Sequence, residues 1–554
     1  MRDFPNDILA RNLLALSGYN LAEATSIGEA HPDPAVRVTQ ARTKDLVPLI
    51  EHESRIKPLH SKFDPQKEAQ RVADQVQDGG FVIVLGFGGG YHIRSLLQNS
   101  DIESLLIIDF GYDMFRAVLS HIDVSDIFID SRVRLFIEPE PSKLHTYLLD
   151  RYIPAVMGNI RSVPLRSRTA MNELFFDSVL KVIEKTISVV SEDYSVQARF
   201  GRRWMSNTLA NLSIAAEANC TITPQRQTMV IAAGPTLDDC KREIMTLRAH
   251  SYCIATDTAI PWLLHHNITP DIILSIDCQL VTYHHFFQSI PKHVPILFDL
   301  ASPPTLTRTA AKPLFFSSGH PFSQYLNAHY KRFPNIDTSG GNVTHAAISL
   351  AHSLGAVKID IFGADYCYPN GKTYANSTYL YNYFRSSENR FTPEYSQMAN
   401  FVFCNSRLKR QWENNTALYS TPTLNSYRKR LIKLSEAYPV NIQNHSPFGP
   451  KFQISPQKPQ SELPIMRWTS DVSNVIPFLR LYADKLNELI IPDGDLTRFF
   501  TDQSKESLQL WMTLFPAVSC FRYSSKGDYS GGRLLEITRS WTVEEIHKTI
   551  IAHA

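Results

Sequence analysis

Short apolar runs separated by polar turns recur along the chain, and most have the length of a buried strand. The clearest spans Thr228 to Leu237 (TMVIAAGPTL), in which the apolar residues stop at a Gly-Pro-Thr turn. Such an ending is typical of a buried strand that leads into a helix. Thr236 is expected to cap that helix, with Asp239 closing a capping box. The turn leaves backbone N–H groups unpaired at the carboxyl edge of a sheet, where phosphate-bearing ligands dock.

Further runs of the same kind follow. Tyr252 to Asp257 (YCIATD) and Asp271 to Asp277 (DIILSID) each end in an acid, and Lys358 to Phe362 (KIDIF) runs into a Gly-Ala-Asp turn. A polar, glycine-centred loop at Thr338 to Thr344 opens an apolar helix, whose start is favourable to anions. Together these runs predict an α/β unit over 221–445 that brings polar groups to one edge of its sheet.

An earlier segment shows a related order. Phe81 to Leu85 is strand-like, the loop Gly86 to Gly90 (GFGGG) precedes a helix, and the strand Ser104 to Ile108 ends at Asp109. This order predicts a nucleotide-binding Rossmann-like half, in which the glycines let a ligand approach the backbone and the acid meets a ribose. The alternative is a loop that only shapes the fold.

The remaining segments are mainly helical. Helical spacing over 151–220, as in Phe175 to Val190 and Trp204 to Ala218, predicts helices that connect two α/β units. Pro447 to Pro464 is expected to be a linker. The predicted fold class is α/β, with two Rossmann-like α/β domains in tandem joined by helices and a mainly helical C-terminal domain. The expected domains cover 1–150, 151–220, 221–445 and 446–554.

Composition narrows the functional classes. The 554 residues carry a formal net charge of +2, which argues against a nucleic-acid partner. Seven cysteines include no C-x-x-C pair and lie mostly in or beside apolar runs, as reduced core thiols do. The start of the chain lacks a signal-peptide pattern, and no run of ~18 apolar residues occurs. We therefore expect a cytoplasmic protein without a membrane span.

Several motifs together resemble one bacterial family, the motility accessory factor (Maf) flagellin glycosyltransferases. The resemblance depends on VIAAGPTL at 230–237, ATDTAIPWLLHHNITPDIILSID at 255–277 and SGGNVTHAAISLAHSLGAVKIDIFGADYCYPNGKTYA at 339–375. LHSKFDPQKEA at 59–69 and VIVLGFGGGYHI at 82–93 are similar to the N-terminal domain of that family. The resemblance implies transfer of a nonulosonic acid, of the pseudaminic or legionaminic type, from a CMP-activated donor to Ser or Thr of flagellin.

The central domain is also similar to bacterial sialyltransferases, in which two loops hold a CMP-sugar and two tyrosines contact its phosphate without a required metal or cofactor. Tyr374 matches one tyrosine, and Tyr368 matches the other if one inserted residue is allowed. The resemblance assigns nucleotide binding to Gly234, Pro235, Thr236, Thr256, Ser339, Gly340, Gly341 and Asn342.

This chain departs from the sialyltransferase pattern at three places. Ala233 and Asp257 stand where those enzymes have asparagine, so the nucleotide contacts must differ. The histidine that serves as general base there has no direct counterpart, and His445 is the histidine after Tyr374 with the most suitable position. A solvated loop histidine is the alternative for His445.

The carboxylates at strand ends complete the candidate catalytic set. They are expected to bind a ribose, a sugar or a divalent ion, or to act as a base, whereas turn capping is their alternative role. The catalytic candidates are Asp257, Asp277, Asp365, Tyr368, Tyr374 and His445.

Two other functions remain open. Archaeal MptE-like pterin diphosphokinases share the Gly-Pro-Ser loop and the strand-end aspartates, and such an activity would need Mg²⁺ at those aspartates. A non-catalytic scaffold that binds flagellin would instead retain the nucleotide loops as remnants.

Overall fold

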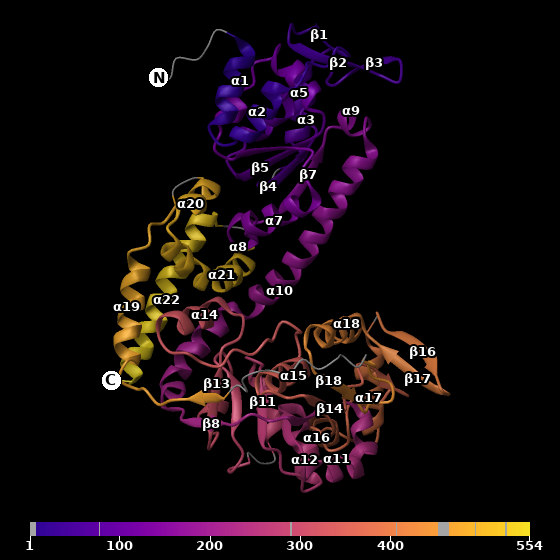
Figure 1. Ribbon diagram of the computed structural model, residues 1–554, viewed down its shortest axis with the longest axis vertical. Helices are drawn as coiled ribbons and strands as arrows, with labels where there is room; N and C mark the ends of the chain where they lie inside the picture. Colours follow the sequence, from indigo (N-terminus) through magenta and orange to yellow (C-terminus); the bar gives the residue numbers. More distant parts are fainter. Residues whose placement is uncertain are drawn as a thin grey trace. The chain divides into compact units, whose positions relative to one another are not determined.

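The structure, a computed structural model, describes residues 7–76, 78–287, 291–405, 407–452, 465–492, 495–526 and 529–553. The chain divides into two compact units, one made of Met1–Gly201 with Asn487–Trp541 and the other of Arg202–Leu486 with Thr542–Ala554 (Figure 1). The C-terminal segment, which the sequence presented as one domain from 446 onward, contributes residues to both units.

The first unit is built on a four-stranded parallel sheet in the order β6-β5-β4-β7. Its strands are β4 (Gly80–Leu85), β5 (Ile102–Asp109), β6 (Val133–Ile137) and β7 (Ile160–Pro164). A separate antiparallel sheet, which the hydrophobic pattern did not reveal, contains β1 (Val36–Gln40), β2 (Leu46–His52) and β3 (Arg55–Pro58). The helices are α1 (Ile8–Ser17), α2 (Leu21–Glu29), α3 (Pro65–Ala73), α4 (Tyr91–Leu97), α5 (Tyr112–Leu119), α6 (Ser125–Ile129), α7 (Pro141–Arg151), α8 (Pro154–Met157), α9 (Arg166–Thr169), α20 (Leu496–Asp502), α21 (Lys505–Ser525) and the start of α22 (Gly531–His553).

The glycine loop after β4 is occupied by side chains of its own unit. The carboxylate of Asp109 accepts the backbone N–H of Phe87 at 2.6 Å, and the ring of His60 accepts the N–H of Gly89 at 2.8 Å. The guanidinium of Arg168 donates to Asp109 at 2.8 Å, and both side chains are almost fully buried. Asp109 therefore braces the loop through an ion pair instead of presenting its carboxylate to a ribose.

The second unit contains a seven-stranded parallel sheet in the order β13-β12-β11-β10-β9-β14-β18. Its strands are β9 (Gln227–Ile231), β10 (Tyr252–Thr256), β11 (Ile272–Ser275), β12 (Ile296–Asp299), β13 (Pro313–Phe316), β14 (Lys358–Phe362) and β18 (Asn441–Asn444). The regular helices are α11 (Lys241–Arg248), α12 (Ile260–His265), α13 (Pro304–Thr307), α14 (Pro321–His329), α15 (Val343–Ser353), α16 (Tyr379–Ser386), α17 (Glu394–Phe403), α18 (Pro422–Ala437) and most of α19 (Val475–Asn487). Three short 3₁₀ helices are η1 (Pro235–Cys240), η2 (Asp257–Ala259) and η3 (Leu280–Phe286).

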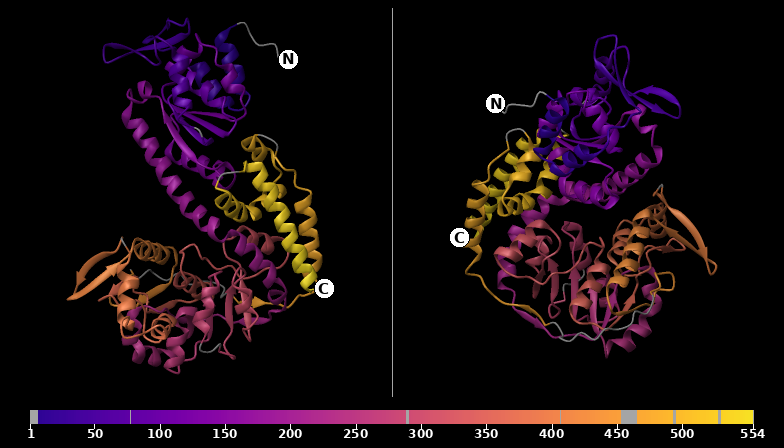
Figure 2. Two further views of the ribbon diagram at one scale, coloured as in Figure 1. Left: turned by 180° about the vertical axis from the view of Figure 1, so that it is seen from behind. Right: turned by 45° about the horizontal axis from the view of Figure 1, so that its top comes forward.

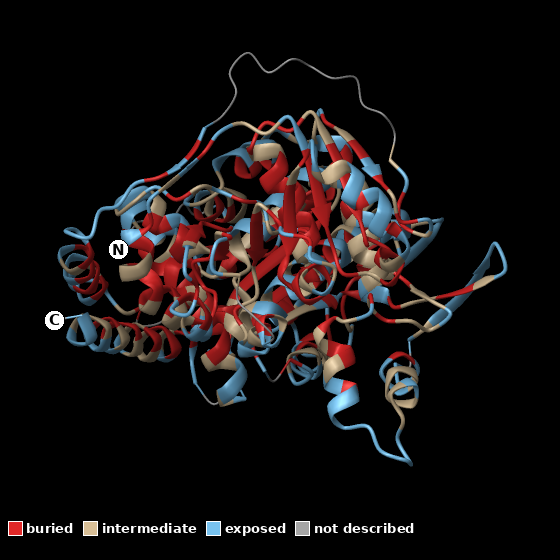
Figure 3. Ribbon diagram, turned by 90° about the horizontal axis from the view of Figure 1, so that it is seen from below, coloured by how far each residue is buried: buried red, intermediate tan, exposed pale blue. Residues whose placement is uncertain are grey.

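The strands of this sheet are buried along most of their length, as the red ribbons of Figure 3 show. Burial on both faces explains why they occur in the sequence as continuous apolar runs. On β14, Ile359 and Ile361 join the core cluster that contains α15. Asp360 points to the other face, where its carboxylate meets His445. The two faces of the sheet are therefore covered by different helices.

Helix α10 (Glu173–Glu217) replaces the two connecting helices expected from the sequence. It is one continuous helix of 45 residues, and the division between the units falls within it. The apolar spacing predicted the helical state of both segments correctly, but nothing in that spacing showed that the helix runs through the residues between them.

Three strands in the insertion between β14 and β18 were also missed. β15 (Tyr368–Pro369), β17 (Thr416–Ser420) and β16 (Lys409–Glu413) form a small antiparallel sheet. Its hairpin projects from the rest of the second unit in both views of Figure 2. A second small sheet pairs β8 (Cys220–Ile222) with β19 (Met466–Trp468). Most of the expected linker, at 453–464, lies outside the described residues.

The predicted fold class, α/β with a helical C-terminal region, is confirmed by these two parallel sheets and by α19 to α22. Among the described residues, no helix is both long and apolar enough to span a membrane.

Breaking the buried ion pair under the glycine loop tests its structural role. Arg168→Met leaves the carboxylate of Asp109 buried without its cation, which lowers the free energy of unfolding by about 3–5 kcal/mol. Urea titration followed by circular dichroism measures the loss. Arg498→Ala removes an exposed pair with Asp502 and should cost about 0.5 kcal/mol or less. A loss for Arg168→Met no larger than that of the control would contradict the bracing role.

Candidate active site

In the second unit, the strand order reverses between the neighbouring strands β9 and β14. From β9 the chain proceeds through β10 to β13 on one side, and β14 returns to the other side of β9. The strands end in register, because Ile231 of β9 pairs with Ala255 of β10 and with Phe362 of β14. A ligand crevice in an α/β protein lies outside the carboxyl ends of such strands. The loops after β9 and β14 are therefore the walls of the candidate site.

The carboxylate of Asp365 fastens these two loops together. It accepts the hydroxyl of Thr236 at 2.5 Å and the backbone N–H of Thr236 at 3.1 Å. Burial raises the pKa of Asp365, and the two donors of Thr236 oppose that rise. The predicted capping by Thr236 is wrong, because its hydroxyl is committed to Asp365, and η1 begins at Pro235 with Gly234 in the N-cap position and no side-chain cap among the described residues.

The close approach of the loops requires glycine at two positions. Gly234 donates its N–H to the carbonyl of Gly363 at 2.8 Å. A Cβ at Gly234 would overlap that carbonyl and a carboxylate oxygen of Asp365. Gly363 has a φ of +69°, which few side chains adopt, and its Cβ would lie 2.6 Å from the carbonyl of Ala232. Any side chain here would separate the two walls.

The second predicted loop precedes α15 and is shaped by packing. Asn342 caps the helix by accepting the N–H of His345 at 3.2 Å. Gly341 has a φ of +78° and lies against Tyr427 of α18. Gly340 packs so closely on the His345 ring that a Cβ would overlap it. The ring is buried, and burial lowers the pKa of His345 to about 4, which keeps the imidazole neutral.

A cavity of about 180 Å³ lies between these loops and the turn after β14. Three polar groups in its lining are buried and form no hydrogen bond of regular geometry within the described chain, namely the amide nitrogen of Asn342 and the hydroxyls of Tyr366 and Thr373. The Tyr366 hydroxyl lies near the side chains of Thr344 and Asn342, which act on it as imperfect partners. Buried polar groups are nearly always paired in folded proteins. Incompletely hydrogen-bonded polar groups gathered in one small cavity are the pattern expected where a polar ligand completes the hydrogen bonding.

The predicted site residues divide into two sets. Those that line the cavity are Gly234, Pro235, Thr256, Asn342, Asp365, Tyr368 and Tyr374. Those that lie outside its described lining are Thr236, Asp257, Asp277, Ser339, Gly340, Gly341 and His445. The first set contains one residue or more from each of the three motifs, so the fold brings segments far apart in sequence to one place.

The two predicted tyrosines lie on the same segment and enter the cavity from β15 and the loop after it. Burial raises the pKa of both hydroxyls, which remain protonated donors at neutral pH. Asp238 anchors this segment, because its carboxylate accepts the ammonium of Lys372 at 2.6 Å and the N–H of Asn376 at 3.0 Å. The tyrosines are thus held by a fixed loop.

The two acids at the ends of β10 and β11 lie beside each other at the same edge of the sheet. Asp257 is buried and accepts the hydroxyl of Ser275 at 2.7 Å and the N–H of Thr258 at 2.7 Å. Asp277 accepts the N–H of Gln279 at 2.9 Å. Burial raises the pKa of Asp277, and the charge of Asp257 adds to that rise. Both acids therefore have turn-capping partners as well as positions at the carboxyl edge.

His445 is held on the face of the sheet that carries α11. One ring nitrogen lies 2.8 Å from the carboxylate of Asp360, and the other lies 2.7 Å from that of Glu243. The ring also stacks on Phe362 with 4.3 Å between centroids. Because carboxylates lie beside both of its ring nitrogens, the surroundings of His445 are those of a residue that stabilises the fold, and not those of a general base.

The sequence alone did not single out two aromatic residues of the cavity. Tyr366 has a φ of +54°, an uncommon conformation for a tyrosine, and its presence in the Gly-Ala-Asp-Tyr turn was the available signal. Tyr427 comes from α18, a helix that was predicted but carried no sign of a site. Only the packing of α18 against the second loop brings it to the cavity.

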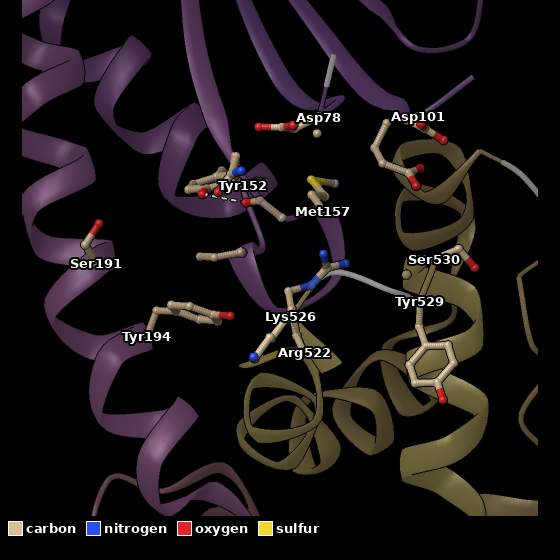
Figure 4. A pocket seen from close by; sticks show the side chains of 16 residues that line it. Asp78, Asp101, Tyr152, Met157, Ser191, Tyr194, Arg522, Lys526, Tyr529 and Ser530 are labelled. Carbon is tan, nitrogen blue, oxygen red and sulfur yellow. Dashed lines mark hydrogen bonds between the residues drawn. The ribbon is translucent and has the colours of Figure 1, made fainter. Parts of the chain in front are cut away.

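A larger cavity of about 810 Å³ lies in the first unit (Figure 4). Arg522 reaches into it and donates to the carbonyl of Ala155 at 2.7 Å, while Asp101 lies on another wall. Burial raises the pKa of Glu103 in this cavity to about 7. The cavity is at the amino ends of β4 and β5, opposite the edge where ligands bind in parallel sheets.

Within the described residues, no group of three or more His, Cys, Asp or Glu side chains is placed to hold a metal ion.

Two family models match the chain. Residues 36–154 match the glycosyltransferase Maf N-terminal domain, and residues 203–371 match a model described as 6-hydroxymethylpterin diphosphokinase MptE-like. The solved structure of a Maf glycosyltransferase from Magnetospirillum magneticum AMB-1 is similar over 98% of this chain and 94% of that one, with a TM-score of 0.57 at 15% identity. The match to the Maf N-terminal domain and the shared fold confirm the resemblance to the Maf family that the motifs showed.

Sequence relatives occur in Treponema pallidum (strain Nichols), where they are described as uncharacterized proteins. One is 32% identical over 157 residues, which cover 27% of this chain and 55% of the relative. Another is 26% identical over 175 residues, which cover 31% of this chain and 83% of the relative. A third is 25% identical over 338 residues, or 58% of each chain. The chain thus matches little more than half the length of the first of these relatives.

The buried neutral ring of His345 predicts a pH-dependent stability. Its pKa is lower in the folded chain than when unfolded, so stability present above pH ~6.5 is lost as the pH falls toward 4, by about 3 kcal/mol. Unfolding free energies of wild type and His345→Gln at pH 7, 6, 5 and 4 measure this, and the variant should lose about 3 kcal/mol less over that window. The exposed His265, as His265→Gln, should behave as wild type. Equal losses in wild type and His345→Gln would refute the assignment.

Proposed function

We propose that this chain, which carries the Maf N-terminal and MptE-like domains and the Maf glycosyltransferase fold, transfers a nonulosonic acid from a CMP-activated donor to Ser or Thr of flagellin. The observation that carries the proposal is the cavity at the strand crossover of the second unit, with its three buried polar groups that form no regular hydrogen bond within the described chain. The cavity is smaller than the ~300–1,000 Å³ of a typical whole-ligand pocket, so it would enclose only part of a nucleotide sugar.

The chemistry of the lining suits a leaving phosphate. Departure of CMP from an oxocarbenium-like sugar leaves negative charge on the phosphate, which fixed hydrogen-bond donors stabilise. Tyr368, Tyr374 and the amide of Asn342 are uncharged donors of this kind. The proposed reaction uses no metal or other cofactor.

The proposal also covers partners and location. Flagellin is the proposed polypeptide acceptor, and a nucleotide sugar is the proposed small-molecule substrate. We place the reaction in the cytoplasm, and the lack of any disulfide among the cysteines of the described residues is compatible with a reducing compartment.

The MptE-like match favours a second candidate, a Mg²⁺-dependent pterin-type diphosphokinase. It would use Asp257, Asp277 or Asp365 to hold Mg²⁺ and would bind ATP. Binding measurements on the whole chain distinguish the two activities, and a scaffold without either activity would bind neither nucleotide.

Calorimetric titration of the purified chain with CMP, with other nucleoside monophosphates and with ATP plus Mg²⁺ tests the donor. We expect CMP to bind without metal, and Gly234→Val to abolish that binding because its side chain would separate the loops around Asp365. Gly319→Val is the matched control, since a Cβ at Gly319 meets no atom within 4 Å and CMP binding should persist.

ATP binding that requires Mg²⁺, with no response to CMP, would replace this proposal by the diphosphokinase. Binding of neither nucleotide would favour the scaffold.

Tyr374→Phe tests the role of one hydroxyl in the reaction. A fixed donor to the leaving group is worth about 2.7–4 kcal/mol in the transition state, so turnover should fall about 10²–10³-fold. Affinity for CMP should change far less. Assays of donor consumption and of CMP affinity measure the two effects, with Tyr395→Phe at an exposed tyrosine as control. Unchanged turnover in Tyr374→Phe would remove that hydroxyl from the mechanism.

A further inference from the structure

A second histidine stands at the carboxyl edge of the same sheet. His285 lies on η3, and its Nδ1 atom is buried without a hydrogen-bond partner within the described chain. The ring of Tyr379, from the start of α16, packs edge-on against it with 4.5 Å between centroids. The contact fixes the plane of the imidazole and leaves Nδ1 without a hydrogen-bond partner among the described residues, whereas both ring nitrogens of His445 have partners.

The charges around His285 favour proton uptake by its ring. Asp257 and Asp277 both act on it, and both are fixed by partners of their own. Burial lowers the pKa of His285, the neighbouring His284 lowers it further, and the two carboxylates oppose both effects. The ring is therefore neutral at pH 7, and the two carboxylates would stabilise an imidazolium formed there.

His285 is connected to the cavity through Asp257 and the aromatic side chains. Thr256 and Thr258, on either side of Asp257, line the cavity. Tyr374 lines it as well, and its hydroxyl, whose pKa is raised mainly by burial, also feels the charges of Tyr379 and Asp257. The histidine thus lies outside the described lining of the cavity, on the side of β10 and β11, where an acceptor bound at that edge of the sheet would meet it.

We infer that His285 is the general base that activates the acceptor hydroxyl, an assignment that depends on the proposed glycosyl transfer. A ring nitrogen of neutral His285 takes the proton of the acceptor Ser or Thr. The acceptor oxygen forms the new bond to the anomeric carbon as the bond from that carbon to the phosphate oxygen breaks, and the nucleoside monophosphate leaves with the electron pair. The imidazolium is held between Asp257 and Asp277 until it returns the proton to solvent.

The test compares His285→Ala with His265→Ala, a matched histidine exposed at the end of α12. A general base contributes about 10²–10⁴-fold, so transfer to the acceptor should fall by that factor in His285→Ala and stay at the wild-type rate in His265→Ala. CMP binding, measured by calorimetry, should be retained. Imidazole added to His285→Ala should restore part of the rate, and the acidic limb of the kcat/KM profile should be lost.

The outcomes separate this inference from the proposed function. Transfer by wild type with an undiminished rate in His285→Ala would overturn the role of His285 and leave the glycosyltransferase intact. A loss of rate that imidazole does not rescue, with an unchanged pH profile, would make His285 a structural residue and overturn the inference. Absence of both CMP binding and transfer in wild type would refute the proposed function itself.

Discussion

The candidate site depends on one buried carboxylate. Asp365 joins the loop after β14 to the loop after β9 through two hydrogen bonds to Thr236, in a place where water is excluded. An acid in such a place would be costly if its oxygens were unpaired. The pairing is possible only because Gly234 and Gly363 let the two backbones approach within hydrogen-bonding distance. These hydrogen bonds fix the two loops relative to each other. They therefore set the position of the cavity and of the side chains that these loops contribute to its lining.

The glycine loop after β4 and the glycine turns around the cavity of the second unit show why a glycine-rich loop alone is weak evidence of a bound ligand. The loop after β4 has a strand before it, a helix after it and an acid at the end of the next strand, as a nucleotide site does. Its N–H groups are nevertheless bonded to Asp109 and His60 of the same unit. In the second unit the lining retains buried polar groups that form no regular hydrogen bond within the described chain. The difference lies in which side chains fill the space beside the loop, and these come from distant parts of the sequence.

The histidines illustrate the same separation between local pattern and environment. His445 follows a strand of the sheet and was the natural candidate for a base, yet Asp360 and Glu243 occupy both of its ring nitrogens. His345 is buried beneath a glycine turn and neutral. His285 follows no motif, but it is the histidine that the fold places beside Asp257 and Asp277. A proton acceptor is defined by the charges and partners around the ring, and those are set by tertiary packing.

The sequence by itself determined the α/β class, the central strands and the three motifs that supply the walls of the cavity, because continuous apolar runs and glycine turns are local consequences of burial and backbone geometry. It also located Asp365, Tyr368 and Tyr374. Only the tertiary structure decided that α10 is one helix, that a hairpin extends from the insertion after β14, and that Tyr366 and Tyr427 face the cavity. Those features depend on contacts between residues far apart in sequence. Such contacts leave no periodic pattern of apolar residues in any one segment, so the sequence of that segment does not reveal them.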